Sequence, residues 1–314
     1  MILDLDSATA FAPATCANVA VGFDLLGFPV EGIGDRVTVM RSGKSGVEIV
    51  AMEGGASSTI PKDATQNTAT VGLIQMLKDV QADFGFAIHI QKGIPMSSGM
   101  GGSASSAVAA VVAANSLLPQ PFSEEKLFHY AMLGEAVASG GFHGDNIAPC
   151  LFGGLTLCRS IHPIDIVRIP VPKDIFCVLI HPDLQVSTKE SRGKLSKDVS
   201  LKDHVLQSAA LGGFIAGCFQ NNLDLIARSF QDIIIEPQRA SQIPGFIEAK
   251  AAALSKGAIG AAISGSGPSV FAWARSFTDA ETIKEVMVSE FKKKNLKTQA
   301  WISPISPMGA RLIV

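Results

Sequence analysis

Charge is scarce in this chain. Charged residues make up 17% of its 314 positions, and the formal net charge at neutral pH is -2. A near-neutral chain gives no support for nucleic acid or an anionic membrane as a partner, because both attract strongly basic surfaces. So little charge is typical of a surface that another subunit partly covers. The length predicts one large domain or two ordinary ones, with an ample core.

Cysteine is also sparse, and its spacing excludes two kinds of scaffold. The five cysteines are scattered, and no C-x-x-C pair occurs, so neither a disulfide framework nor a zinc site is indicated. We expect buried, reduced thiols. The sequence opens without a basic region and apolar run, and its apolar stretches are too short or too interrupted to span a bilayer. These absences favour a reduced, cytoplasmic setting and give no support for a membrane partner.

Glycine, by contrast, is concentrated in one stretch, KGIPMSSGMGGSASSAV at residues 92–108. An alternating apolar run (84–90) precedes it and an alanine-rich run (104–114) follows, which predicts a strand, a glycine-rich loop and a helix. Glycine lets a ligand approach the backbone closely, and a helix N-terminus offers free N–H groups and partial positive charge. The pattern therefore favours phosphate binding. A plain connector before a core helix is the alternative.

Two common phosphate motifs do not fit this loop. A Walker A loop ends in Gly-Lys-Ser/Thr, and Gly102-Ser103 lacks the lysine. A dinucleotide-binding fingerprint needs a third glycine where this chain has Ala104. The loop therefore belongs to neither of these classes.

Polar residues stand out in other segments. Asn18 and Asp24 lie in an apolar neighbourhood, so each needs a polar partner, and capping a turn is the alternative role. His143, Asp145 and Asn146 fall in an expected glycine-rich loop over 139–149. Such a loop allows side chains to converge, but a surface turn has the same composition.

Two arginines and a second glycine-rich turn complete the candidates. Arg192 and Arg239 each follow a motif at the edge of a helix, where a solvated arginine is the plainer interpretation. Residues 257–273 read GAIGAAISGSGPSVFAW, which predicts two strands around a glycine-rich turn.

Periodicity predicts the remaining elements. The run at 175–182 is almost continuously apolar, as in a strand buried on both faces. We place a domain boundary near residue 165, which gives domains 1–165 and 166–314. Strands are expected at 35–40, 46–51, 84–90, 155–159, 164–169, 175–182, 297–303 and 308–314, and helices at 66–80, 104–118, 123–138, 203–220, 222–234 and 278–294.

In order, these stretches resemble the motifs of the GHMP kinases, and most closely those of the homoserine kinases among them. Residues 13–24 match P-A-T-x-A-N-x-x-x-G-F-D, residues 95–104 resemble P-x-x-x-G-L-G-S-S-A, and residues 139–146 resemble S-G-x-H-x-D-N. Residues 187–192 match S-T-K-x-x-R, residues 236–239 match E-P-x-R, and residues 257–269 match the third GHMP motif. Gly102 replaces the first serine of the family's pair. The resemblance covers essentially the whole chain.

The resemblance implies a fold of the α+β class. Its N-terminal domain would be of the ribosomal protein S5 domain 2-like type and would bind ATP, and its C-terminal domain would be ferredoxin-like. Members of the family are often homodimers, which agrees with the low surface charge.

The resemblance also implies ATP-dependent phosphorylation of the side-chain hydroxyl of L-homoserine in threonine biosynthesis. Ser103 and Glu135 would hold Mg²⁺, and these two residues with Asn146 form the expected catalytic set. The ATP loop would comprise Pro95, Met96, Ser97, Ser98, Gly99, Met100, Gly101, Gly102, Ser103, Ala104 and Ser105. The substrate would contact Asn18, Asp24, His143, Asp145, Asn146, Arg192 and Arg239.

Asn146 marks a difference from other GHMP kinases. Mevalonate and galactose kinases carry an aspartate base near this position, and an amide cannot accept a proton at neutral pH. We therefore assign Asn146 to orienting the hydroxyl and leave the base open. Two other functions remain possible at this stage: another GHMP small-molecule kinase of the mevalonate-pathway type, or an inactive nucleotide-binding protein of the same fold.

Overall fold

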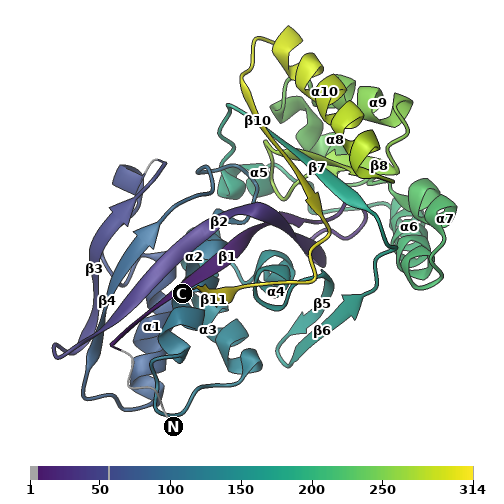
Figure 1. Cartoon of the computed structure of the whole chain (residues 1–314). Coiled ribbons are helices and arrows are strands. Elements are labelled where there is room, and N and C mark those ends of the chain that lie inside the picture. Colours follow the sequence, from purple (N-terminus) through teal and green to yellow (C-terminus); the bar gives the residue numbers. More distant parts are fainter. Residues whose placement is uncertain (1–5, 56, 314) are drawn as a thin grey trace.

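The computed structural model describes residues 6–55 and 57–313. They form two domains that pack against each other, one on a seven-stranded sheet and one on a four-stranded sheet (Figure 1). No helix within these ranges combines the length and apolar character needed to cross a membrane. Residues 1–5, part of the opening stretch in which we found no leader pattern, and residue 314 lie outside the described residues.

The N-terminal domain is built on a mixed sheet in the order β11-β1-β2-β4-β3, with the β5–β6 hairpin joined through β2. β3 and β4 pair in parallel, and β1 and β2 run antiparallel over most of their length. The strands are β1 (Ser7–Ala17), β2 (Leu26–Ser42), β3 (Gly46–Glu53), β4 (Gly85–Gln91), β5 (Leu155–Ile161), β6 (Ile164–Ile169) and β11 (Arg311–Ile313).

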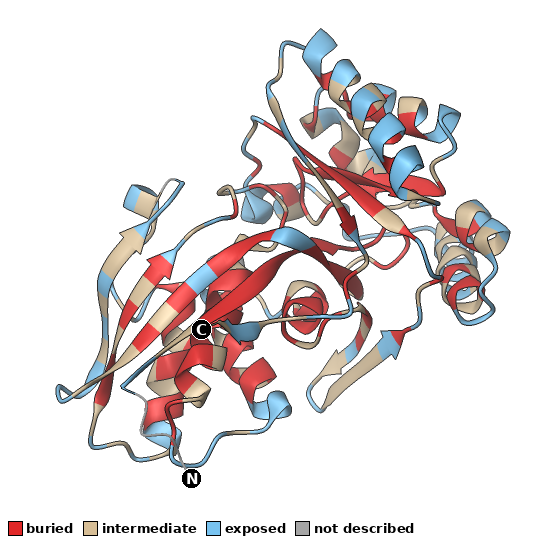
Figure 2. Cartoon of the chain, viewed as in Figure 1, coloured by how far each residue is buried: buried red, intermediate tan, exposed pale blue. Residues whose placement is uncertain are grey.

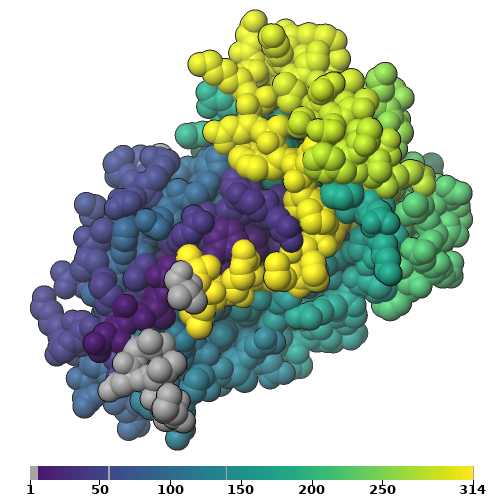
Figure 3. All heavy atoms as spheres, viewed as in Figure 1, coloured from purple at the N-terminus to yellow at the C-terminus, as the bar shows by residue number. Residues whose placement is uncertain are grey.

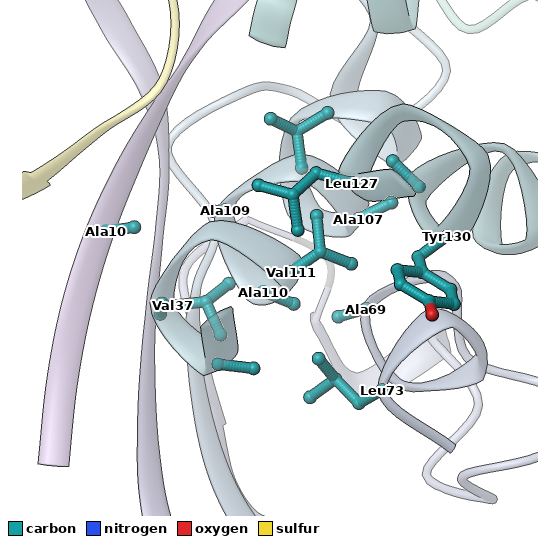
Figure 4. Packing of buried hydrophobic residues seen from close by; sticks show 14 of the residues in the cluster. Ala10, Val37, Ala69, Leu73, Ala107, Ala109, Ala110, Val111, Leu127 and Tyr130 are labelled. Carbon is teal, nitrogen blue, oxygen red and sulfur yellow. The ribbon is translucent and has the colours of Figure 1, made fainter. Parts of the chain in front are cut away.

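Helices α1 (Thr68–Asp79), α2 (Gly102–Asn115) and α3 (Glu124–Ser139) pack together on one face of this sheet. A short 3₁₀ turn, η1 (Ser57–Thr59), follows β3. α2 consists of small and β-branched residues and is buried on nearly every side. In Figure 4 its residues Ala110 and Val111 lie between Val37 of the sheet and Leu73 and Tyr130 of the flanking helices. This packing fixes the position of the N-terminus of α2, where the glycine-rich loop ends.

The C-terminal domain has an antiparallel sheet in the order β10-β7-β9-β8. With its helices, this order gives the expected ferredoxin-like arrangement, and β7 is buried along most of its length as its sequence predicts (Figure 2). The elements are β7 (Phe176–Pro182), α5 (Thr188–Gly193), α6 (Leu201–Phe219), α7 (Leu223–Ser229), α8 (Glu236–Arg239), η2 (Ala240–Gln242), α9 (Phe246–Ser255), β8 (Gly260–Ile263), β9 (Val270–Ala274), α10 (Phe277–Lys293) and β10 (Thr298–Pro304).

The structure corrects the expected helix over 222–234. α7 ends at Ser229, because the carboxylate of Asp232 accepts hydrogen bonds of 3.0, 2.8 and 3.0 Å from the N–H groups of Ile234, Ile235 and Glu236. An aspartate whose carboxylate accepts hydrogen bonds from the backbone N–H groups of the next few residues favours a turn over a continued helix. The helical periodicity did not reveal this turn.

The chain also divides differently between its two domains. The expected boundary after residue 165 falls inside β6, so the two sheets separate after Ile169 instead. The strand expected at 308–314 is β11, which pairs with β1 of the first domain. Figure 3 shows this C-terminal segment, in yellow, crossing the N-terminal domain beside its purple first strand.

One hydrophobic cluster joins the two domains. Phe28 of β2 packs edge-on against Phe271 and Trp273 of β9, with ring centroids 5.5 and 5.7 Å apart. All three side chains are buried. Buried aromatic contacts of this kind hold the two domains in a fixed relation, so residues from both can build one site.

Candidate active site

The glycine-rich loop connects β4 to α2, in the order that the sequence predicts. Gly101 is the N-cap residue of α2 and has a φ of 67°. A Cβ at this position would lie 2.1 Å from Oγ1 of Thr15 and 2.8 Å from Oδ1 of Asn146. Glycine is therefore required where the loop meets the helix. The first N–H groups of α2 and its dipole favour an anion in this loop.

The turn between β8 and β9 packs on this loop. Oγ of Ser264 donates a 2.8 Å hydrogen bond to the carbonyl oxygen of Gly99, and the N–H of Ser269 donates one of 3.0 Å to that of Ser98. A Cβ at Gly99 would lie only 2.4 Å from the carbonyl oxygen of Ser264. The second glycine-rich motif thus supports the first one from the other domain.

Part of the expected ATP loop points away from any ligand. The side chains of Met100, Ala104 and Ser105 are fully buried. Oγ of Ser105 donates a 2.7 Å hydrogen bond to the carbonyl oxygen of Ala12, and its N–H donates one of 2.8 Å to that of Gly101. Both donors of Ser105 are used inside the protein, so its side chain anchors α2 to β1, and its contact with ATP stays a prediction.

Ser103 and Glu135 meet beside the loop. Oγ of Ser103 donates a 2.6 Å hydrogen bond to Oε2 of Glu135, which joins the first turn of α2 to α3. Burial raises the pKa of Glu135 to about 7, although the bond from Ser103 and the charge of Lys92 lower it. A nearby cation would favour the ionised carboxylate.

These two side chains fit a magnesium ion. A carboxylate and a hydroxyl are oxygen ligands of the kind that Mg²⁺ prefers, and the ion usually takes its other ligands from water and phosphate. The described residues contain no group of three or more His, Cys, Asp or Glu side chains suited to a metal. A site with one carboxylate is therefore compatible with Mg²⁺ that takes its remaining ligands from water and a nucleotide phosphate.

The sequence analysis did not predict a buried ion pair that lies under the loop. Nζ of Lys92 pairs with Oδ2 of Asp35 and donates hydrogen bonds of 2.7 Å to the carbonyl oxygen of Gly102 and 2.9 Å to Oγ of Ser106. The other oxygen of Asp35 accepts the N–H of Gly93 at 3.0 Å. The pair therefore holds the start of the loop against the start of α2. A lysine directly before the loop was the only signal in the sequence.

A cavity of about 220 Å³ opens next to Ser103 and Lys92. Apolar and polar groups share its wall, which includes Met52, Ile60, Ile90, Met96, Asn67 and Thr68. A site of this kind suits a flat heteroaromatic group, which needs apolar faces and a few hydrogen bonds at its edge. Sequence reasoning missed it, because its wall comes from many short segments that are far apart in the sequence.

Asp24 and Arg192 face each other across the domain junction. Nη1 and Nη2 of Arg192 donate hydrogen bonds of 2.9 and 2.6 Å to the two carboxylate oxygens of Asp24. Nδ1 of His143 lies 3.8 Å from Oδ2 of Asp24, and burial, then the charge of Arg192, lowers the pKa of this histidine. Asn18 accepts the N–H of Asp24 at 3.1 Å and donates to the carbonyl oxygen of Gly265 at 2.9 Å. Asn18 therefore also has the turn-forming role considered from its sequence.

Arg239 lies beside this group. Its Nη1 donates a 2.7 Å hydrogen bond to the carbonyl oxygen of Gly265, and its Nε is buried without a partner in the described part of the chain. The guanidinium carbons of Arg192 and Arg239 each lie 5.2 Å from the ring centroid of Phe23. Burial, then the charge of Arg192, lowers the pKa of Arg239. Two converging cations, one with an unused donor, favour an anionic ligand.

The structure corrects the expected loop over 139–149, which continues as helix α4 (Gly144–Phe152). Asp145 and Asn146 therefore lie in its first turn, beside its positive end. Oδ1 of Asn146 accepts a 2.6 Å hydrogen bond from Oγ1 of Thr15. Oδ1 of Asp145 is buried with no hydrogen bond from any described residue. Burial, then the charges of Asp24 and Glu135, raises the pKa of Asp145 to about 7.

The expected site residues thus form two adjacent groups, one at the glycine-rich loop of the N-terminal domain and one where Asp24 meets Arg192 of the C-terminal domain. Asn146 connects the two groups, because its amide lies beside Gly101 of the loop while its neighbour Asp145 is close enough to Asp24 and Arg192 to sense their charges. Within the expected set, Ser105 and the buried side chains of Met100 and Ala104 are turned away from these groups.

Comparison with known proteins agrees with this geometry. Residues 68–154 match the GHMP kinases N terminal domain, and residues 210–293 match the GHMP kinases C terminal family. A homoserine kinase of Xylella fastidiosa (strain M12) is 46% identical over 98% of this chain and 94% of its own length. One from Xanthomonas campestris pv. campestris (strain B100) is 45% identical over 98% and 95%.

A solved structure agrees as well. The crystal structure of homoserine kinase from Cytophaga hutchinsonii superposes with a TM-score of 0.95 at 42% identity and covers 98% of both chains. A glycine-rich loop at a helix N-terminus, on this pair of domains, defines a GHMP kinase. Within that class, the chain belongs to the homoserine kinase family.

Proposed function

We propose that this chain transfers the γ-phosphoryl group of ATP to the side-chain hydroxyl of L-homoserine, which gives O-phospho-L-homoserine for threonine biosynthesis. The position of Asn146 supports this most directly, because its amide lies beside Gly101 of the glycine-rich loop, while its neighbour Asp145 is close enough to Asp24 and Arg192 to sense their charges. Phosphoryl transfer depends mainly on in-line positioning and charge stabilisation, and both require two adjacent subsites of this kind.

The nucleotide is held by the loop and the cavity beside it. The backbone of 95–103 and the N-terminus of α2 bind the phosphates, and the cavity next to Ser103 and Lys92 takes the base. Ser103 and Glu135 would hold Mg²⁺, which would supply positive charge to the phosphate oxygens. Oε2 of Glu135 accepts the hydrogen bond from the Ser103 hydroxyl at 2.6 Å, so the two proposed metal-binding groups lie side by side.

The amino acid is held by opposite charges. Its carboxylate binds Arg192 and Arg239, and its ammonium binds Asp24 and Asp145, with Asn18 and His143 at the edge of the pocket. Without substrate, Arg192 and Asp24 satisfy each other. A zwitterion offers each of them a new partner of the right sign, whereas a molecule with only one charge leaves the other residue unpaired.

We assign no protein group as the acceptor of the hydroxyl proton. Asn146 orients this hydroxyl through its amide but cannot take the proton. The hydroxyl oxygen bonds to the γ-phosphorus, the bond to the oxygen of the ADP leaving group breaks, and the proton passes to a γ-phosphate oxygen. Asn146→Asp should then add no basic limb to the pH–rate profile. A new limb at the wild-type rate would contradict this assignment.

We further propose that the chain works as a homodimer in the cytoplasm. The five cysteines are buried and unpaired, as expected for a reducing compartment. Helix α6 exposes Leu201, Val205 and Phe219, whose exposed fractions are 78%, 56% and 60%. Apolar exposure on this scale favours a protein partner.

One assay separates the candidate functions. ADP release should be measured with homoserine, mevalonate, galactose and shikimate under the same conditions. We expect turnover with homoserine to be at least about a hundredfold above the others. Only homoserine carries both a carboxylate for the arginines and an ammonium for the aspartates of the pocket. Preference for mevalonate would favour another GHMP kinase, and ATP binding without any turnover would favour an inactive nucleotide-binding protein.

A further inference from the structure

A second cavity adjoins the Asp24–Arg192 ion pair. It has a volume of about 520 Å³, and its wall comes from the β1–β2 connection, the end of α5, the segment between α5 and α6, α6 itself, and the turn before α8. Arg192 lines it, whereas Asn18, Asp145 and Asn146 do not. It is therefore a separate space that shares one arginine with the proposed homoserine pocket.

Most of its wall is apolar. Val21, Leu25, Leu211 and Ile234 face it, and Phe23 lies where the cavity and the arginine pair meet. The volume and the apolar lining are those of a pocket for a small organic molecule. Such a wall would stabilise the apolar part of a ligand by removing it from water.

The charged side chains of the wall have one sign. Arg192 and Lys197 line the cavity, and no described Asp or Glu does. The side chain of Lys197 makes no hydrogen bond or ion pair with any described residue. Arg192 uses two N–H groups on Asp24, and a guanidinium carries five. The polar end of a ligand in this cavity therefore meets unused cationic donors.

We propose that this cavity is a second binding site, for a monocarboxylate with an extended apolar body. The carboxylate contacts Arg192 and Lys197, and the acyl or aryl body lies along α6. Because Arg192 is shared, the bound anion competes with Asp24 and with the carboxylate of homoserine for the same guanidinium. Occupation of the cavity therefore raises the KM for homoserine and leaves the KM for ATP unchanged.

Binding can be measured without any assumption about the catalysed reaction. Octanoate is titrated into the full-length protein loaded with the fluorescent anion 1-anilinonaphthalene-8-sulfonate, and octanamide serves as its neutral match. We expect octanoate to displace the probe at least about tenfold better than octanamide, since a hydrogen bond to a charged group has roughly that effect. Lys197→Ala should reduce this preference.

The location is tested at Ser208, an exposed residue of α6 that lines the cavity. Ser208→Trp fills the space and should abolish displacement by octanoate, whereas Ser208→Ala should preserve it. Equal displacement by octanoate and octanamide, or unchanged octanoate binding in Ser208→Trp, would overturn the site.

Steady-state kinetics then test the coupling. Octanoate should raise the KM for homoserine several-fold in wild type and in Ser208→Ala, but not in Ser208→Trp, with the KM for ATP constant in all three. A homoserine KM that octanoate does not change would overturn the coupling through Arg192. If the protein proves inactive toward homoserine, the displacement experiments still decide whether the site exists.

Discussion

Asp24 and Arg192 are 168 residues apart in the sequence and belong to different domains, yet they form two parallel hydrogen bonds of 2.9 and 2.6 Å. The pair places a carboxylate and a guanidinium together in a partly buried pocket before any substrate enters. A free amino acid carries the same two charges. In the proposed site, binding would exchange this internal ion pair for two ion pairs with the ligand, and the site would keep its net charge.

This exchange predicts the effect of removing either arginine. Arg192→Ala and Arg239→Ala should each lower kcat/KM for homoserine by about ten- to a hundredfold, because a charge-assisted hydrogen bond is lost. The loss should appear in the KM for homoserine and spare that for ATP. Steady-state kinetics with each substrate varied in turn measure both. Arg228→Ala, which removes an exposed arginine from α7, is the matched control.

The analogue 3-amino-1-propanol sharpens this prediction. It keeps the amine and the hydroxyl but lacks the carboxylate, so it should be a poor substrate for wild type and nearly insensitive to both arginine substitutions. If wild type phosphorylates it as well as homoserine, or if both variants retain wild-type kinetics, the arginines do not bind the carboxylate.

The carboxylate of Glu135 gives the second prediction. Glu135→Ala and Glu135→Gln should both lower kcat by about a hundredfold or more, because charge on the transferred phosphoryl group then loses part of its stabilisation. The glutamine variant can keep the hydrogen bond from Ser103, so it separates the role of the charge from that of the contact. Thermal unfolding should show that both variants remain folded. Near-wild-type rates at low Mg²⁺ concentration would remove Glu135 from the metal site.

The glycine at the start of α2 gives the third prediction. Gly101→Ala should weaken ATP binding and lower kcat, because the new Cβ would lie 2.1 Å from Oγ1 of Thr15 and 2.8 Å from Oδ1 of Asn146, at a φ of 67°. Gly102→Ala is the comparison, since its nearest contact would be 3.3 Å from Cγ2 of Ile94. Gly102→Ala should therefore lose much less ATP affinity and kcat than Gly101→Ala.

Direct titration of ATP, together with kcat, decides this case. If Gly101→Ala binds ATP and turns over as Gly102→Ala does, the loop does not hold the triphosphate.

Local sequence was enough to predict the strand, loop and helix around Gly101, because glycine and alternation act within a few residues. It also predicted the strands at 175–182 and 297–303 and the helix at 278–294, whereas the ferredoxin-like arrangement came from the family resemblance. Local sequence did not predict the turn at Asp232 that follows the end of α7. The periodicity of apolar residues gives no information about a polar side chain that accepts hydrogen bonds from the backbone of the next few residues. Such a turn depends on one carboxylate rather than on a pattern.

The candidate residues could be named from their motifs, but their pairing could not. Nothing near Asp35 or Lys92 in the sequence indicates that they meet under the loop, because that contact depends on the packing of β2 against β4 and α2. For the same reason Ser105 resembled a ligand-binding serine although both of its donors are used by the fold. Spacing identifies side chains that are able to react, whereas packing decides which remain available.

The buried carboxyl of Asp145 gives the last prediction, which concerns pH. Burial, then the charges of Asp24 and Glu135, raises its pKa to about 7 in the folded protein, from 3.8. The folded state therefore holds this proton more tightly than the unfolded state does, so the contribution to stability is complete below about pH 4 and is lost as the pH rises through about 7. Asp145→Asn should raise the Tm by a few degrees at pH 8 and much less at pH 5.

The surface variant Asp198→Asn is the control for this prediction and should shift the Tm equally at both pH values, because Asp198 is exposed. Homoserine should have a related effect, since its ammonium favours the ionised form of Asp145. Binding near pH 6.5 should then release protons, which calorimetry detects as a binding enthalpy that varies with the ionisation enthalpy of the buffer. The dependence should weaken in Asp145→Asn. A binding enthalpy that is equal in all buffers for wild type would show that Asp145 does not ionise when the amino acid binds, and the ammonium would then be held by Asp24 alone.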